Sequence, residues 1–184
     1  MAASQRRHPG AVTPAAEEIA AAIETWRKEA PAPLVVAIDG HGAAGKTTLA
    51  AQLSIALDAM VIHLDEYLHD AQESADPRPM AEYYAWQALR DEALEPAISW
   101  LQADPEGWGG AGLILVEGVS SGAPALADLV HRAVFVSTPE PLRLERLHDR
   151  ISDEEWDEEW LYAERLYFAS RPPDSFDLVV SGSA

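Results

Sequence analysis

The sequence predicts an α/β fold in which a mostly parallel, five-stranded sheet lies between two layers of helices. Short apolar runs rich in β-branched residues alternate with segments of helical spacing, a pattern typical of parallel sheets that are covered on both faces. A glycine-rich segment, 40–47, joins the first apolar run to a helical segment. The chain has 184 residues and no internal repeat, so we expect one domain over residues 14–184 after a flexible tail over residues 1–13.

The predicted elements alternate along the chain. Strands are expected at residues 34–39, 60–64, 113–118, 133–137 and 177–180, because these runs are short and apolar. Helices are expected at residues 14–29, 48–57, 80–101, 124–132, 139–150 and 152–170, where the residues have helical spacing. Thr13 is expected to cap the first helix, and Pro96 to kink or break the third.

Residues 40–47 read Gly-His-Gly-Ala-Ala-Gly-Lys-Thr and match Gly-x-x-x-x-Gly-Lys-Ser/Thr, the phosphate-binding loop (P-loop) of nucleoside triphosphatases. Its glycines let the backbone curl until successive N–H groups surround phosphate oxygens. Lys46 is predicted to reach the β- and γ-phosphates, and the Thr47 hydroxyl to bind Mg²⁺. The motif therefore specifies the P-loop NTPase fold and predicts Mg²⁺ and a nucleoside triphosphate, with ATP expected over GTP. The predicted nucleotide-binding residues are Gly40, His41, Gly42, Ala43, Ala44, Gly45, Lys46, Thr47 and Thr48.

Composition excludes several classes of partner. The formal net charge of −18 argues against a nucleic-acid backbone, which requires clustered Lys and Arg. The chain has no cysteine, so disulfides and thiolate-bound zinc are excluded. No apolar run approaches the length of a membrane span, and Glu17 and Glu18 argue against a secretion signal after Arg6-Arg7. We expect a cytoplasmic protein with a small-molecule partner, and the sequence leaves a homo-oligomer open.

Two acidic residues stand where predicted strands end. Asp65 follows the second strand and Glu117 lies near the end of the third. Ligands of parallel sheets bind at the carboxyl ends of strands, so both residues should converge on the loop. Asp65 is our candidate for orienting an acceptor hydroxyl and accepting its proton, and it is also a candidate metal ligand. Glu117 is our candidate for holding Mg²⁺ or its bound water. The alternative for each is that it caps a turn.

Arg143, Arg146 and Arg150 fall on one face of the helix predicted at residues 139–150, because their spacings are three and four. Arg146 and Arg150 are predicted to neutralise charge on a transferring phosphoryl group, and the alternative is a solvated basic face. For Arg143 we prefer the solvated interpretation, in which it pairs with the acidic run at 153–159.

Four aromatic residues follow the second strand: Tyr67, Tyr83, Tyr84 and Trp86. They are candidates for stacking on an aromatic acceptor such as a nucleobase, and the alternative is that they belong to the core. His63 and His69 lack the spacing of a metal site, so the sequence assigns them no role.

These segments together resemble the uridine kinase-like branch of the P-loop kinases, the group that includes phosphoribulokinase. The resemblance rests on residues 38–48, 64–67, 116–118, 143–150 and 177–180, and residues 81–86 and 156–164 are similar to a bacterial subgroup. It implies that Asp65 is the catalytic base and that Glu117 serves the metal site. It further implies that Arg146 and Arg150 belong to a lid around residues 143–155 and contact ATP phosphates.

The function expected from the sequence is ATP-dependent phosphorylation of a hydroxyl on a small, nucleoside-like metabolite. One alternative is a nucleotide-binding module without phosphotransfer, and another is a kinase whose acceptor already carries a phosphate. Ala85 and Ile151 replace acids of the family pattern, and the segment 101–112 is short. The sequence therefore does not identify the acceptor.

Overall fold

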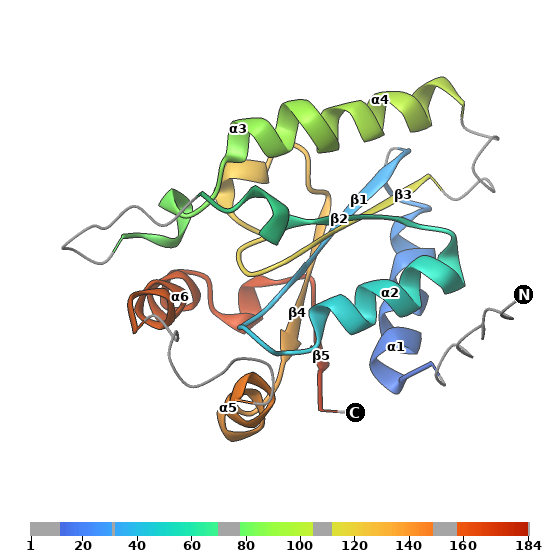
Figure 1. Ribbon diagram of the computed structural model, residues 1–184. Coiled ribbons are helices and arrows are strands. Elements are labelled where there is room, and N and C mark those ends of the chain that lie inside the picture. Colours follow the sequence, from blue (N-terminus) through green and yellow to red (C-terminus); the bar gives the residue numbers. More distant parts are fainter. Residues whose placement is uncertain (1–11, 31, 70–77, 105–111, 149–157, 184) are drawn as a thin grey trace, which may run out of the picture.

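The computed structural model describes residues 12–30, 32–69, 78–104, 112–148 and 158–183, which form a three-layer α/β arrangement (Figure 1). The predicted five-stranded sheet is confirmed, and all neighbouring strands are parallel. The strands are β1 (Leu34–Asp39), β2 (Met60–His63), β3 (Leu113–Glu117), β4 (Arg132–Ser137) and β5 (Leu178–Ser181). They lie in the order β2-β3-β1-β4-β5, so that β1 is central.

Helices cover both faces of this sheet. On one face, α1 (Pro14–Trp26) and α2 (Lys46–Leu57) pack against Val36 and Ile38 of β1. Val35 and Ala37 point to the other face, because successive side chains alternate along a strand. Figure 1 shows α1 and α2 on one side of the sheet and α3, α4 and α6 on the other. That second layer consists of α3 (Trp86–Ala88), the π-helical segment η3 (Leu89–Leu94), α4 (Glu95–Ala103) and α6 (Glu158–Ser170).

The long helix predicted at residues 80–101 begins later than expected. Met80–Glu82 forms a separate 3₁₀ turn, η2, and the continuous helix starts at Trp86. Pro96 does not break the helix, but the turn before it is π-helical. A proline ring clashes with the carbonyl four residues earlier and offers it no N–H, and the wider π turn accommodates both effects.

Two other predicted helices also differ from the structure or extend beyond the described residues. The helix predicted at 124–132 is a single 3₁₀ turn, η4 (Pro124–Leu126), because Leu129 and Val130 turn into the core before β4 begins. The turn after β2 is also 3₁₀, η1 (Leu64–Tyr67), and a further turn, η5 (Pro173–Ser175), precedes β5. The helix α5 spans Glu140–His148, and the rest of the predicted lid, up to residue 155, lies outside the described residues.

The first helix is capped as predicted, since the Thr13 hydroxyl accepts a hydrogen bond from the Ala16 N–H at 3.3 Å. The same hydroxyl donates to Gln52 Oε1 of α2 at 2.9 Å, which joins α1 to the helix after the loop. None of the helices in the described ranges is long and apolar enough to cross a membrane.

The parallel strands bring their carboxyl ends to one edge of the sheet. The register places His63 beside Glu117, and Glu117 beside Ile38. The glycine loop therefore leaves β1 next to the ends of β2 and β3, where the predicted acidic residues lie.

Candidate functional site

The loop at residues 40–45 connects β1 to α2, as the motif requires. Gly45 precedes the helix with φ of 99°, a left-handed conformation that a side chain would strain. No described side chain caps this end of α2. The first N–H groups of a helix have no partner within the helix, so those of Lys46, Thr47 and Thr48 are suited to an anionic ligand.

Donors from other parts of the chain hold the outer carbonyls of the loop. Arg143 Nη1 donates to Gly42 O at 3.4 Å, and Arg146 Nη1 donates to Ala43 O at 3.3 Å. The Thr138 hydroxyl, just after β4, donates to Ala44 O at 2.9 Å. In a planar trans peptide the N–H points opposite to the C=O. The N–H groups of Ala43 and Gly45 therefore point away from these donors, toward the concave side of the loop, which is the geometry of a phosphate cradle.

Lys46 lies inside this loop and is 7% exposed. Its Nζ donates to the carbonyls of Gly40 and His41, both at 2.9 Å. Burial lowers the pKa of Lys46, while the carboxylates of Asp39, Glu117, Glu164 and Asp65 act to raise it. The site thus holds one lysine among four acids from β1, β3, α6 and the turn η1 that follows β2.

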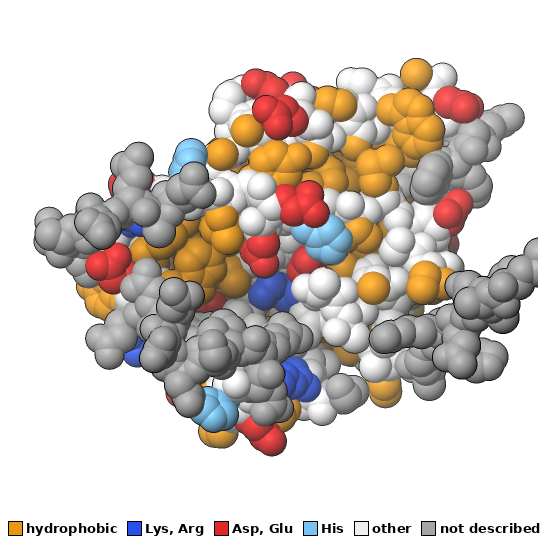
Figure 2. Space-filling view, in the orientation of Figure 1, with side chains coloured by type: hydrophobic (Ala, Val, Ile, Leu, Met, Phe, Trp, Pro, Cys, Tyr) orange, Lys and Arg blue, Asp and Glu red, His pale blue; other side chains and the backbone are white. Residues whose placement is uncertain are grey.

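Glu117 and Thr47 are hydrogen-bonded to each other. The Thr47 hydroxyl lies 3.2 Å and 3.3 Å from the two carboxylate oxygens of Glu117. His63 Nδ1 lies 2.6 Å from Glu117 Oε1. Figure 2 shows acidic, basic and histidine side chains gathered near the middle of this face, beside a hydrophobic area. The arrangement places two oxygen donors, the hydroxyl and the carboxylate, at the start of α2.

Asp65 lies in η1, beside Lys46 and Glu117. Its side chain is partly exposed to solvent, and a Cβ added to Gly118 would lie 3.5 Å from its Oδ1. The protein around Asp65 raises the pKa of its carboxyl through partial burial and the charge of Glu117, although Lys46 and His63 act to lower it. A raised pKa makes a carboxylate a better proton acceptor near neutral pH.

A hollow lies beside the loop, between it, α5 and the end of β5. Its volume is about 190 Å³, and it is lined by Thr13, Ala43, Gly45, Thr48, Leu49, Arg146, Ser181 and Gly182. Arg146 also donates from Nη2 to the Gly182 carbonyl at 3.0 Å, which joins α5 to the end of β5. Pockets for whole drug-sized ligands measure about 300–1,000 Å³, so this hollow fits a part of a ligand, such as one planar base.

Gly182→Ala is expected to weaken nucleotide binding about tenfold, the lower end of the cost of overpacking. A Cβ at Gly182 would collide with the Ala44 carbonyl and the Thr138 hydroxyl, and would push the loop out of shape. Calorimetric titration with ATP measures the effect, with exposed Ser183→Ala as the control. Equal ATP affinity in the two variants would contradict this role for the packing of Gly182.

No protein-family model matches the sequence, and a comparison with curated proteins gives no match. Among solved structures, the chain is similar to a possible uridine kinase from Bacillus stearothermophilus, at 19% identity over 88% of this chain and 98% of that chain, with a TM-score of 0.58. It is also similar to a sugar kinase from Janibacter sp. HTCC2649, at 14% identity over 84% and 87%, with a TM-score of 0.53. The chain has the P-loop NTPase fold. At these identities the likeness concerns the fold.

The predicted site residues divide into three groups. The P-loop, Asp65 and Glu117 lie together at the carboxyl edge of the sheet, as their positions in the sequence suggested. Arg146 donates to the Ala43 carbonyl of the P-loop and lines the hollow, so its contact with a phosphate stays a prediction. Arg150 lies outside the described residues.

The predicted acceptor-binding aromatics are mostly in the core. Tyr83 and Tyr84 are 8% and 2% exposed, and Tyr67 and Trp86 pack against the same cluster while partly exposed. Burial, together with the nearby charges of Asp65 and Asp39, raises the pKa of Tyr84, so the cluster approaches the acidic side of the site. Stacking on an acceptor stays a prediction for all four.

Several polar residues of the site were missed or misread in the sequence. Arg143, interpreted as solvated, is 7% exposed and contacts the P-loop. Asp39 is fully buried and accepts hydrogen bonds from the Gly40, Ser120 and Gly122 N–H groups and from the Tyr167 hydroxyl. Glu164 and His63 received no role. In the sequence, Asp39 and His63 could have been recognised as site residues only because each is a polar residue at the end of a predicted strand.

Proposed function

We propose that this protein is a Mg²⁺- and ATP-dependent phosphotransferase that phosphorylates a hydroxyl of a small, nucleoside-like metabolite. The main observation behind this proposal is that the P-loop lysine, the Thr47–Glu117 pair and Asp65 lie at the same end of the sheet. A protein that only binds a nucleotide does not require a carboxylate such as Asp65, which follows β2 and lies near Lys46. The two similar structures support the proposal, because one is a possible uridine kinase and the other a sugar kinase.

In this proposal the triphosphate lies along the P-loop. The N–H groups of Ala43, Gly45 and the first turn of α2 bind phosphate oxygens, and Lys46 contacts the β- and γ-phosphates. The base occupies the hollow beside Arg146 and Gly182. The γ-phosphate, bound by Lys46, then lies near Asp65, because the two side chains are close enough to interact electrostatically.

Asp65 orients the acceptor. Its carboxylate accepts a hydrogen bond from the hydroxyl, whose oxygen attacks the γ-phosphorus. The bond between that phosphorus and the bridging oxygen breaks, ADP leaves, and the hydroxyl proton passes to Asp65 and then to solvent. Lys46 and the loop N–H groups stabilise the negative charge on the transferring group.

The residues at the start of α2 fit Mg²⁺, because the hydroxyl of Thr47 and the carboxylate of Glu117 are adjacent oxygen donors and Mg²⁺ prefers oxygen ligands. Thr47 and Glu117 would hold the ion, directly or through water. When bound, Mg²⁺ would neutralise charge on the phosphates.

Glu117→Gln is expected to raise the Mg²⁺ concentration for half-maximal turnover by about tenfold, in the range found when groups that support a metal are removed. Gln keeps the shape of Glu117 and removes its charge. The measurement is turnover against Mg²⁺ concentration at saturating ATP. Glu66→Gln, at an exposed acid in η1, is the matched control. An unchanged Mg²⁺ dependence in Glu117→Gln would remove this residue from the metal site.

The test of the proposed function is ADP release from ATP over a panel of nucleosides, sugars and other hydroxyl-bearing metabolites. The proposal predicts release that depends on one class of acceptor. ATP binding without acceptor-dependent release across the panel would instead favour a nucleotide-binding module.

A further inference from the structure

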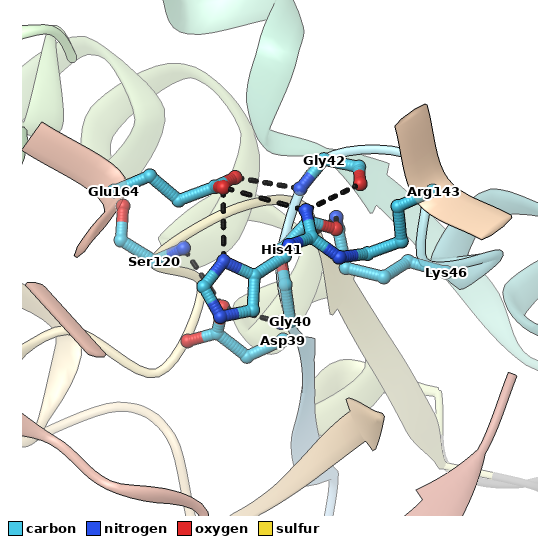
Figure 3. A network of polar contacts seen from close by, with 8 residues as sticks. All are labelled: Asp39, Gly40, His41, Gly42, Lys46, Ser120, Arg143 and Glu164. Atoms are coloured by element: carbon cyan, nitrogen blue, oxygen red, sulfur yellow. Dashed lines mark hydrogen bonds and ion pairs between the residues drawn. The ribbon is translucent and has the colours of Figure 1, made fainter. Parts of the chain in front are cut away.

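Glu164, on α6, reaches the P-loop from 122 residues further along the chain. It is 2% exposed. The Gly42 N–H donates to its Oε1 at 2.6 Å, and its Oε2 lies 2.9 Å from His41 Nδ1. Figure 3 shows this carboxylate facing both residues. A buried carboxylate is costly unless donors satisfy it, so these contacts explain how Glu164 can lie here.

Arg143, on α5, contacts both Glu164 and Gly42. Its Nη1 lies 3.7 Å from Glu164 Oε2 and 3.4 Å from the Gly42 carbonyl (Figure 3). Gly42 is therefore held by both of its polar backbone groups, the N–H by Glu164 and the C=O by Arg143. Since Arg143 also faces Glu164, one carboxylate supports both contacts.

Glu164 is ionised in this position. Burial alone would raise its pKa, but the hydrogen bonds with His41 and Gly42, together with the charges of His41 and Lys46, more than offset that effect and lower the pKa. Its charge therefore contributes to holding Gly42, His41 and Arg143.

The next turn of α6 contacts the same part of the loop. The Phe168 ring lies 4.2 Å from the His41 ring, centroid to centroid. The Tyr167 hydroxyl donates to Asp39 at 2.7 Å, and Asp39 accepts from the Gly40 N–H. One face of α6 thus contacts residues 39–42, whose carbonyls at Gly40 and His41 orient Lys46.

We propose that Glu164 is a positioning residue of the nucleotide site: by binding His41 and Gly42 it holds the half of the P-loop that orients Lys46 toward the γ-phosphate. This inference rests on the proposed function. Lys46 serves the β- and γ-phosphates, whereas the N–H groups at the start of α2 do not depend on Glu164. Loss of Glu164 should therefore affect ATP more than ADP.

An opposite role can be tested with the same variant. If the Glu164 carboxylate instead competed with the γ-phosphate for the Gly42 N–H, its removal would strengthen ATP binding. The sign of the change in ATP affinity separates positioning from competition.

The experiment compares Glu164→Gln with Glu145→Gln, the same change at an exposed position of α5. Calorimetry with the β,γ-imido analogue of ATP and with ADP gives the two affinities, and steady-state kinetics give kcat and KM. In Glu164→Gln we expect the affinity for the ATP analogue and kcat each to fall about tenfold, the lower range for losing a hydrogen bond to a charged group. ADP affinity should change by less than about threefold, since the α2 N–H groups remain.

Three results would overturn the inference: equal losses for ATP and ADP, tighter ATP binding, or no change relative to Glu145→Gln. If the wild-type chain binds no nucleotide, the proposed function itself is wrong. If the wild type binds ATP and Glu164→Gln matches it, only the positioning role is wrong.

His41→Phe provides a second variant that does not alter the buried acid. It keeps a ring against Phe168 and removes the nitrogen that contacts Glu164. We expect the same selective loss of ATP affinity. In the double variant the loss should be smaller than the sum of the two single losses, because contacting residues are not additive. Additive losses would show that Glu164 does not act through His41.

Discussion

Lys46→Ala is expected to lower acceptor-dependent turnover by about 10³-fold and to weaken ATP binding strongly, since removing one preorganised donor from a transition state costs about 10²–10³-fold. Lys46 also supplies a charge-assisted contact to the ground state. In addition, the variant leaves the Gly40 and His41 carbonyls without their donor, so the loop itself loses support. Turnover and ATP titration with the purified chain measure both effects.

Lys28→Ala is the matched control for this prediction. Lys28 is exposed and follows α1, near the start of β1 and therefore at the edge of the sheet opposite the P-loop. It should retain wild-type turnover. If Lys46→Ala retained ATP affinity and turnover as well, the assignment of residues 40–47 as a phosphate-binding loop would fail.

Asp65→Asn is expected to lower kcat by about 10²- to 10⁴-fold, the usual contribution of a positioned proton acceptor. The amide keeps the size of Asp65 but cannot take the proton from the acceptor. ATP affinity should stay within about threefold, because the phosphates are bound by the loop and Lys46. Stopped-flow turnover and calorimetry separate these two quantities.

Glu66→Gln, next in the chain, removes one charge from the same turn and should leave kcat within about twofold, as for most exposed substitutions. This comparison excludes a general effect of charge on η1. A large loss of ATP affinity in Asp65→Asn, with kcat unchanged, would mean that Asp65 serves nucleotide binding instead of phosphoryl transfer.

The part of the site that the sequence predicted lies in short, continuous sequence segments. The P-loop is one run of eight residues, and its fold context is the strand before it and the helix after it. Asp65 and Glu117 could be placed because the ends of parallel strands meet at one edge. The order of the strands was not needed for this, since every strand end reaches that edge.

The supporting contacts could not be predicted, because they join distant segments. Glu164 and Gly42 are 122 residues apart, and Arg143 and Gly42 are 101 apart. His63 and Glu117 become neighbours only because β2 pairs with β3. In the sequence, Glu164 belongs to a helix with other charged residues, and nothing distinguishes an acid that is buried against a loop from one that faces water.

Contacts between distant segments also explain why the aromatic residues are buried. Tyr83 and Tyr84 were candidates for binding an acceptor because aromatic rings can stack on a nucleobase. They are buried because Tyr84 forms an isolated antiparallel bridge with Leu68, and because the Trp160 ring of α6 lies 5.2 Å from the Tyr83 ring, centroid to centroid. Trp160, which packs against both tyrosines, lies 77 residues after Tyr83 in the sequence.

The most direct test of the central claim is transfer of label from γ-labelled ATP to an acceptor, compared between the wild type and Asp65→Asn. The acceptor is the one that gives the strongest ADP release in the panel. The account predicts labelled product with the wild type, formed at the rate of ADP release, and a loss of about 10²-fold or more with Asp65→Asn. Unlabelled acceptor with the wild type, or equal labelling by both proteins, would contradict it.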